Sequence, residues 1–210
     1  MEEQEQEQEQ QHQQTWWKDN AEAQLNHFKH WVGDASAPSK VYMAEYLKGC
    51  PSYQTVLDAG CGTGTFYDTL RQHNLSMDYT GADSCPYFLR MNRERGLHMI
   101  EADIRFLPLP ERAVDVAFSR HTFEHQPGPI AVLKELIRVA RREACHIFFI
   151  KPLEGAEAKP VINWDPVTNL YHNTYRRVDI EGLLSRHPDV ASWRWVDVNE
   201  QECALHVYRK

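Results

Sequence analysis

The sequence lacks the features that mark membrane and secreted proteins. It has no apolar run near the roughly 20 residues that a membrane-spanning helix needs, and its first residues show no basic and then apolar secretory pattern. Cysteine is scarce and odd in number, with no Cys-x-x-Cys pair: Cys50, Cys61, Cys85, Cys145 and Cys203. We therefore expect reduced thiols in a cytoplasmic protein, and neither a disulfide framework nor a zinc finger. The sequence also has no excess of basic residues, and its net charge is -7. Because an acidic surface repels the phosphate backbone of nucleic acids, no nucleic-acid partner is expected.

The chain of 210 residues, 42% of them hydrophobic, suits one domain with one sizeable core. Residues 1–14 alternate Glu and Gln with almost nothing apolar, which predicts a disordered tail. We expect the domain to occupy residues 15–210. Within it, residues 15–50 predict an N-terminal helical lid, since Leu25, Phe28 and Trp31 recur at helical spacing.

From residue 53 onward, short apolar runs alternate with segments of helical periodicity. The runs indicate strands near 55–57, 79–82, 97–100, 114–118 and 144–150, and the periodic segments indicate helices near 65–73, 86–95, 129–140 and 177–186. Two further strands, 192–198 and 203–208, flank a short polar turn. This order predicts an α/β, Rossmann-like, doubly wound fold. Its seven-stranded sheet is mostly parallel, with a C-terminal antiparallel hairpin and N-terminal lid helices.

The strongest motif is the glycine-rich turn from Val56 to Gly64. A strand enters the turn directly, and a helix begins near Thr65. Glycine permits a sharp turn and leaves space for a ligand, while the helix N-terminus offers free N–H groups. A dinucleotide fingerprint has its third glycine where Thr65 stands, and Asp58 would repel a pyrophosphate but attract an ammonium group. An NAD-linked oxidoreductase is the less favoured alternative.

The string Leu57–Gly64 resembles the "LDxGCGTG" signature of the class I S-adenosylmethionine-dependent methyltransferases, and the resemblance covers about residues 53–150. It implies an enzyme that uses S-adenosyl-L-methionine as its methyl donor. In that family the glycine loop cradles the methionine part of the cofactor. The resemblance therefore implies that the cofactor contacts Asp58, Gly60, Cys61, Gly62 and Gly64.

Other predicted strands end in residues that fit the same ligand, because ligands of open α/β sheets bind beyond the carboxyl ends of the strands. Asp83 ends the second strand, where the family binds the ribose hydroxyls, and Ser84 follows it. Asp103 stands in a segment similar to the family's "xxDxxxLPxP", whose Asp accepts from the adenine amino group while the next residue, Ile104, contacts the ring. After the fourth strand, the resemblance implies backbone contacts from two more residues, Ser119 and Arg120.

The same loop contains a competing motif. His121-x-x-Glu124-His125 matches the inverted zinc-protease pattern H-x-x-E-H, which would make the protein a zinc hydrolase. Because Pro127-Gly128-Pro129 follows at once, little helix is left to hold both histidines on one face. We expect no metal, and we expect Glu124 and His125 to begin the next helix and to hydrogen-bond within the loop.

The substrate is expected between the cofactor and an insertion over the active site, residues 151–176. His121 is the best-placed candidate for a general base, followed by His172 and Tyr175. The segment Ser119–Thr122 carries neither motif of the DNA methyltransferases, so a small-molecule acceptor is favoured, with a protein side chain second. The acceptor atom (O, N or C) and the oligomeric state stay open, as does a catalytically inactive binding module with an interaction or regulatory role.

Overall fold

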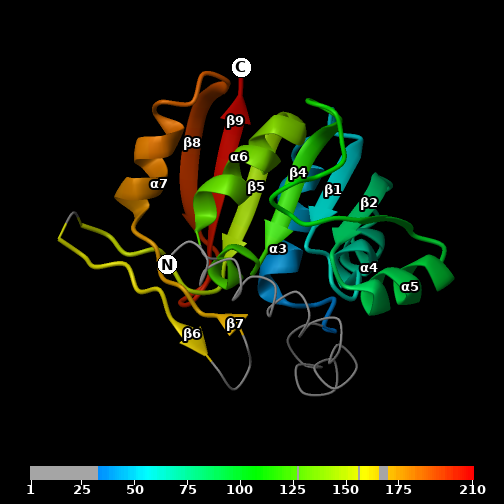
Figure 1. Cartoon of the computed structure of the whole chain (residues 1–210). Helices are drawn as coiled ribbons and strands as arrows, with labels where there is room; N and C mark the ends of the chain where they lie inside the picture. The colour runs from blue at the N-terminus through cyan, green and yellow to red at the C-terminus, as the bar shows by residue number, and fades with distance from the viewer. Residues whose placement is uncertain (1–32, 127, 156, 166–169) are drawn as a thin grey trace.

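The structure, a computed structural model, describes residues 33–210 except 127, 156 and 166–169 (Figure 1). The predicted tail (1–14) and the aromatic segment that follows it, up to Val32, lie outside the described residues. Described helices are α3 (Pro38–Lys48), α4 (Thr65–Gln72), α5 (Pro86–Glu94), α6 (Pro129–Val139) and α7 (Arg177–Leu184), with a short 3-10 turn η1 (Phe123–His125). None of these helices combines the length and apolar character that crossing a bilayer requires.

Seven strands form one sheet: β1 (Thr55–Ala59), β2 (Asp78–Asp83), β3 (His98–Glu101), β4 (Val114–Arg120), β5 (Ala140–Phe148), β8 (Val190–Asp197) and β9 (Cys203–Arg209). Their order is β3-β2-β1-β4-β5-β9-β8. All neighbours pair in parallel except at β9, which runs antiparallel to both β5 and β8. The predicted fold class and the antiparallel terminal hairpin are confirmed. The chain changes direction across the sheet between β1 and β4.

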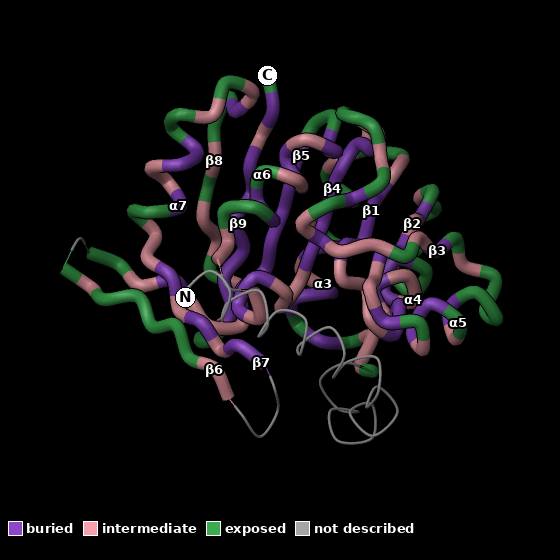
Figure 2. Tube along the Cα trace, viewed as in Figure 1, coloured by how far each residue is buried: buried purple, intermediate pink, exposed green. Residues whose placement is uncertain are grey.

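Successive residues of a strand point to opposite faces of the sheet. Because the central strands are apolar on both faces, helices cover both. On one face, α3 and α4 pack over a core that includes Val56 and Phe118; on the other, α6 and α7 pack over a core that includes Leu57 and Ala117. Figure 2 shows β1 and β4 buried along most of their length, as expected for parallel strands with helices on both faces.

Strand β5 differs from its prediction because it begins at Ala140, directly after α6, and not at residue 144. Its first residues include the exposed Arg141 and Arg142, which broke the apolar run in the sequence. The guanidinium of Arg141 lies 2.8 Å from the carboxylate of Asp115 on β4, so a cross-strand ion pair replaces hydrophobic packing there. Sequence periodicity detects burial, and these residues are in a strand without being buried.

The predicted insertion forms an extended arm that leaves the sheet and returns to it (Figure 1). It contains a small antiparallel pair, β6 (Trp164–Asp165) and β7 (Leu170–Tyr171). On its return, the backbone N–H of Asn173 donates to the Glu124 carbonyl at 2.9 Å. The arm is therefore fixed to η1, the turn that follows β4, and lies at the carboxyl end of the sheet.

Helix α6 carries an apolar face on which Ile137 is fully buried, whereas Ile130, near the start of the same helix, is 53% exposed. We expect Ile137→Ala to lower the free energy of unfolding by about 2–5 kcal/mol, because it removes buried methyl groups and leaves a cavity. Ile130→Ala is the matched control and should change it by less than about 0.5 kcal/mol. Urea unfolding of both variants measures the difference, and equal losses would show that α6 packs differently.

Candidate functional site

A cavity of about 480 Å³ opens at the carboxyl ends of β1, β2 and β4, where the strand order reverses. This is the place where open α/β sheets bind ligands. Its lining includes nine of the predicted cofactor residues, namely Asp58, Gly60, Cys61, Gly62, Asp83, Ser84, Asp103, Ile104 and Arg120, and two of the predicted bases, His121 and His172. Thus residues spread over more than a hundred positions of sequence meet around one space.

The glycine turn brings bare backbone to this cavity. Gly60 and Gly62 have φ angles of 76° and 51°, in the left-handed region that favours glycine. A Cβ atom on Gly60 would lie 2.4 Å from the methyl carbon of Thr122, so a side chain would force the turn away from the loop after β4. The backbone N–H of Gly60 donates to the Ala82 carbonyl at 2.8 Å, which joins the turn to the end of β2.

Asp83, at the end of β2, fixes the other side of the turn. Its carboxylate accepts the backbone N–H of Gly62 and that of Cys85, both at 2.8 Å and on different oxygens. Burial raises the pKa of Asp83, and these two backbone donors act in the opposite direction. Because each carboxylate oxygen has two lone pairs, each can still accept one hydroxyl of a ligand.

Asp58 is almost fully buried, at 4% exposure, and accepts the Tyr79 hydroxyl at 2.7 Å. Burial raises its pKa to about 6, against the effects of the Tyr79 hydrogen bond and of the Lys40 charge. A carboxylate held out of water in this way gains when a cation approaches it. Asp58 is therefore suited to an ammonium group on a ligand.

Lys40, on α3, lines the same cavity and was not identified from the sequence. Its ammonium donates to the Asp34 carbonyl at 2.9 Å and to the Thr65 hydroxyl, and burial lowers its pKa to about 8. Nothing in the sequence separated this lysine from the others, because its burial depends on how α3 packs on α4. Three cationic side chains therefore line the cavity: Lys40, Arg105 and Arg120.

Asp103 lines the cavity but already has a strong partner. The Arg105 guanidinium donates to both of its carboxylate oxygens, with Nε at 3.0 and 3.1 Å, and the Arg105 backbone N–H donates at 2.8 Å. The predicted hydrogen bond from an adenine amino group must share these oxygens with Arg105. Ile104, at 9% exposure, lies beside them and offers an apolar surface to a planar ring.

Three predicted site residues do not line the cavity: Gly64, Ser119 and Tyr175. Gly64 caps α4 in the left-handed conformation, where a Cβ would meet Asn92 at 2.5 Å. Ser119 bonds to a ring nitrogen of His146 at 2.6 Å in the core. The Tyr175 hydroxyl donates to backbone carbonyls of Phe123 and Gln126, both at 2.8 Å. The side chains of Ser119 and Tyr175 therefore bond within the fold, and the backbone contact expected of Ser119 stays a prediction.

The H-x-x-E-H residues have separate partners and do not converge on one point. Glu124 is fully buried, and its carboxylate accepts the Phe149 backbone N–H at 2.6 Å. His125 contacts the Tyr171 carbonyl of the arm at 2.7 Å through Nδ1, and its backbone N–H donates to the Thr122 carbonyl within its own loop at 3.2 Å. Glu124 and His125 form η1 instead of beginning α6. This geometry gives no support to a zinc hydrolase.

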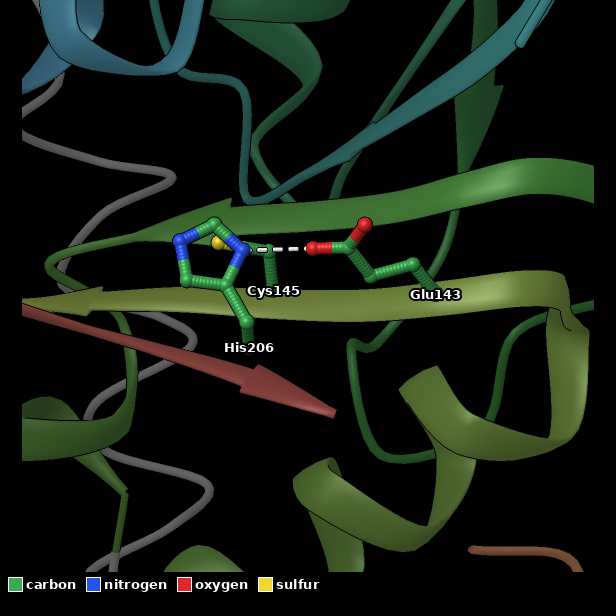
Figure 3. Close-up of side chains that lie close together, drawn as sticks. All are labelled: Glu143, Cys145 and His206. Atoms are coloured by element: carbon green, nitrogen blue, oxygen red, sulfur yellow. Dashed lines mark hydrogen bonds and ion pairs between the residues drawn. The ribbon is translucent and has the colours of Figure 1, made fainter. Parts of the chain in front are cut away.

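Across the described part of the chain, Glu143, Cys145 and His206 are the residues that bring metal-binding atoms close together (Figure 3). The ionisable groups of Glu143 and His206 already have hydrogen-bond partners. Both ring nitrogens of His206 are engaged, Nδ1 with Glu143 and Nε2 with the Tyr42 hydroxyl at 2.7 Å. The second oxygen of Glu143 accepts the Tyr46 hydroxyl at 2.7 Å. This buried network joins α3 to β5 and β9, and none of the three residues lines the cavity.

Residues 57–148 match a family model described as a methyltransferase domain. This segment is a methyltransferase domain, with the class I fold of S-adenosylmethionine-dependent enzymes. The matched segment runs from β1 to β5 and holds most residues of the cavity. S-adenosylmethionine is the cofactor of this family. The glycine turn lies within the methyltransferase match, which favours this cofactor over NAD.

Relatives of this methyltransferase chain act on different acceptors. It is 34% identical over 129 residues to a malonyl-[acyl-carrier protein] O-methyltransferase of Serratia marcescens, covering 58% of this chain and 50% of that protein. It is 25% identical over 132 residues to a tRNA (carboxymethyluridine(34)-5-O)-methyltransferase of Arabidopsis thaliana, covering 61% and 32%. The chain thus spans half or less of the length of these curated relatives.

The same fold occurs in the magnesium protoporphyrin IX methyltransferase of Synechocystis PCC 6803, solved with S-adenosylmethionine bound. The TM-score is 0.68 at 14% identity, and the match covers 94% of this chain and 97% of that one. The likeness therefore extends over much more of the chain than the family model, which covers residues 57–148. It shows the fold of the methyltransferase and leaves the acceptor open.

Because the groups around His206 are already hydrogen-bonded, we expect no structural metal there. Dialysis of the methyltransferase against EDTA should leave its melting temperature unchanged within about 1 °C, whereas loss of a structural metal removes several kcal/mol of folding free energy. Differential scanning fluorimetry with and without added zinc makes the measurement. A large drop in EDTA that zinc reverses would contradict the assignment.

Proposed function

We propose that this protein transfers a methyl group from S-adenosylmethionine to a small-molecule acceptor. One observation carries the proposal: Asp58, Asp83 and Asp103, from three successive strand ends, line one cavity together with the bare glycine turn. A carboxylate for an ammonium group, one for ribose hydroxyls and one near an amino-purine ring fit that cofactor. The family match supports the same conclusion independently.

The described residues fit each part of the cofactor. Asp83 has acceptor capacity for the ribose hydroxyls after its two backbone bonds, and the absence of a side chain at Gly60 and Gly62 leaves room beside the turn. Asp58 suits the ammonium group of the methionine part, and the cations of Lys40 and Arg120 suit its carboxylate. The cofactor supplies a methyl group already activated on a sulfonium sulfur. The protein's own task is then to align the acceptor and to exclude water.

The remaining lining defines the acceptor end of the cavity. It comes from the loop after β4, from the end of β5 and from the arm: His121, His125, Gln126, Phe149, Leu170 and His172. Aromatic and apolar walls with a few polar groups are typical of small-molecule pockets. The acidic net charge of -7 disfavours a nucleic acid as acceptor. A protein side chain is the second candidate, and free cysteines support a cytoplasmic location.

Titration calorimetry tests the cofactor assignment. We expect S-adenosylmethionine and S-adenosylhomocysteine to bind, and NAD not to bind. Asp83→Asn should weaken both affinities by roughly 10–100-fold, since hydrogen bonds to a charged group contribute about 1.5–3 kcal/mol. If both cofactor forms fail to bind the folded wild-type protein, the proposed function is wrong.

Asp78→Asn is the matched control for the previous experiment. Asp78 begins the same strand, is exposed, and lies at the end away from the cavity. The control should bind as wild type does. An acceptor screen with methyl-labelled cofactor then separates an active enzyme from an inactive binding module, because the latter would bind both cofactor forms and transfer no label.

Cofactor affinity should depend on pH through Asp58, whose pKa burial raises to about 6. Below pH 6 this carboxyl gains a proton and loses its attraction for the ammonium group, so binding should weaken by about tenfold between pH 7 and pH 5. Asp58→Asn should bind more weakly at pH 7 and show a much flatter profile. Calorimetry at four pH values checks this, and a parallel decline in both proteins would exclude Asp58 as its source.

A further inference from the structure

Glu202, in the turn between β8 and β9, has a buried carboxylate that the cofactor assignment does not use. The residue is 8% exposed and is not part of the cavity lining. It nevertheless reaches the loop after β4, 81 residues away in sequence, where it meets His121. A buried carboxylate needs strong partners to remain charged, so its contacts indicate what it holds in place.

Three elements hold the Glu202 carboxylate. Its Oε1 accepts the hydroxyl of Ser39 on α3 at 2.6 Å, and its Oε2 accepts the side-chain amide of Asn199 in its own turn at 2.6 Å. The guanidinium of Arg120, at 3.5 Å from Oε1, also donates to Ser39 at 2.7 Å. The carboxylate is thus fixed on both oxygens before His121 is considered.

His121 completes this group, with its Nε2 2.6 Å from Oε1 of Glu202. Although burial acts to raise the pKa of Glu202, the hydrogen bonds from His121 and Ser39 lower it to about 2. Burial lowers the pKa of His121 to about 4. At neutral pH the pair is therefore a carboxylate, which can only accept, beside a neutral imidazole, which has one N–H.

That combination determines the tautomer of His121. Its proton must be on Nε2, because a carboxylate cannot donate, and Nδ1 then carries the lone pair. Within the described residues, no group hydrogen-bonds to Nδ1 of His121. The ring packs edge-on against Phe149 with centroids 5.3 Å apart, and both residues line the acceptor end of the cavity.

The backbone supports the same orientation. His121 has a φ of 56°, in the left-handed region that non-glycine residues rarely adopt, and its N–H donates to the Ile147 carbonyl at 2.9 Å. Such conformations cluster where function requires a side chain in one direction. Here the turned backbone directs the ring between Glu202 and Phe149.

We propose that Glu202 is a positioning residue that orients His121 so that its Nδ1 can take a proton from the methyl acceptor. This proposal rests on the proposed function. The acceptor heteroatom gives its proton to Nδ1 as its lone pair forms the new bond to the methyl carbon. The electron pair of the broken carbon–sulfur bond stays on sulfur. The imidazolium formed lies beside the Glu202 carboxylate, which balances its charge, and later loses its proton to water.

This arrangement also selects a class of acceptor. A lone pair on Nδ1 attracts an O–H or N–H group and repels an ionised carboxylate. The acceptor is therefore a molecule whose reacting atom still bears hydrogen, such as a phenol or a ring N–H heterocycle, and it lies against Phe149 and the arm. Carboxylic acids are poor acceptors in this cavity.

The tautomer can be measured without any acceptor. In ¹⁵N-histidine-labelled protein, long-range ¹H–¹⁵N NMR at pH 7 should show His121 with its proton on Nε2. Glu202→Gln, whose amide can donate or accept, should give a mixture of tautomers, while Glu200→Gln in the same turn, at an exposed position, should match wild type. A proton on Nδ1 in the wild-type protein overturns the proposal even if no variant folds.

Binding and turnover then separate this proposal from the proposed function. Calorimetry should show S-adenosylhomocysteine binding to Glu202→Gln within about twofold of wild type, while kcat on phenol or imidazole acceptors falls about 100-fold and KM for the cofactor is unchanged. Unchanged kcat, or better turnover of carboxylic acids than of phenols, overturns the proposal. If the wild-type protein does not bind the cofactor, the proposed function is wrong. The NMR measurement of the His121 tautomer can still be interpreted in that case, because it needs no cofactor.

Discussion

The bond between the Gly62 backbone and the Asp83 carboxylate is the interaction on which the site depends. It holds a turn of unusual backbone conformation against the end of the neighbouring strand, and the carboxylate can occupy this place because two backbone donors replace part of its lost hydration. The N–H groups of Gly60 and Cys61, which donate to the Ala82 carbonyl, hold the same turn at a second point. The ligand space is thus a product of backbone hydrogen bonding as much as of side-chain size.

Charge is arranged around this turn in pairs that offset one another. Asp58 is flanked by the cations of Lys40 and Arg120, while Arg120 is itself shared with Glu202. Each buried charge therefore has an opposite charge or a polar partner nearby, as burial requires. The methionine part of the cofactor is a zwitterion, with one ammonium and one carboxylate group. The protein offers a carboxylate, Asp58, and the cations of Lys40 and Arg120 at separate positions in the same cavity.

Much of this could be predicted from the sequence. The glycine turn and the aspartates at strand ends were identified because local spacing and strand periodicity place them, and nine cofactor residues do line the cavity. Lys40 and Glu202 were not identified, since their positions depend on packing between elements far apart in sequence. The side chains of Ser119 and Tyr175 turn inward to His146 and to backbone carbonyls, so Tyr175, a candidate base, bonds within the fold, while the backbone contact expected of Ser119 stays a prediction. Motifs locate a backbone segment; only tertiary packing decides which way each side chain points.

The position of β9 inside the sheet has a consequence for how the chain is made. Cys203–Arg209 lies between β5 and β8, so the sheet is assembled from a segment that leaves the ribosome after all the other strands. Until then β5 presents an open edge of unpaired peptide groups, and such edges invite pairing with other chains. The sheet therefore stays incomplete until β9 has been synthesised. During that interval, protection by chaperones matters more for β5 than for strands that pair with a neighbour as soon as they emerge.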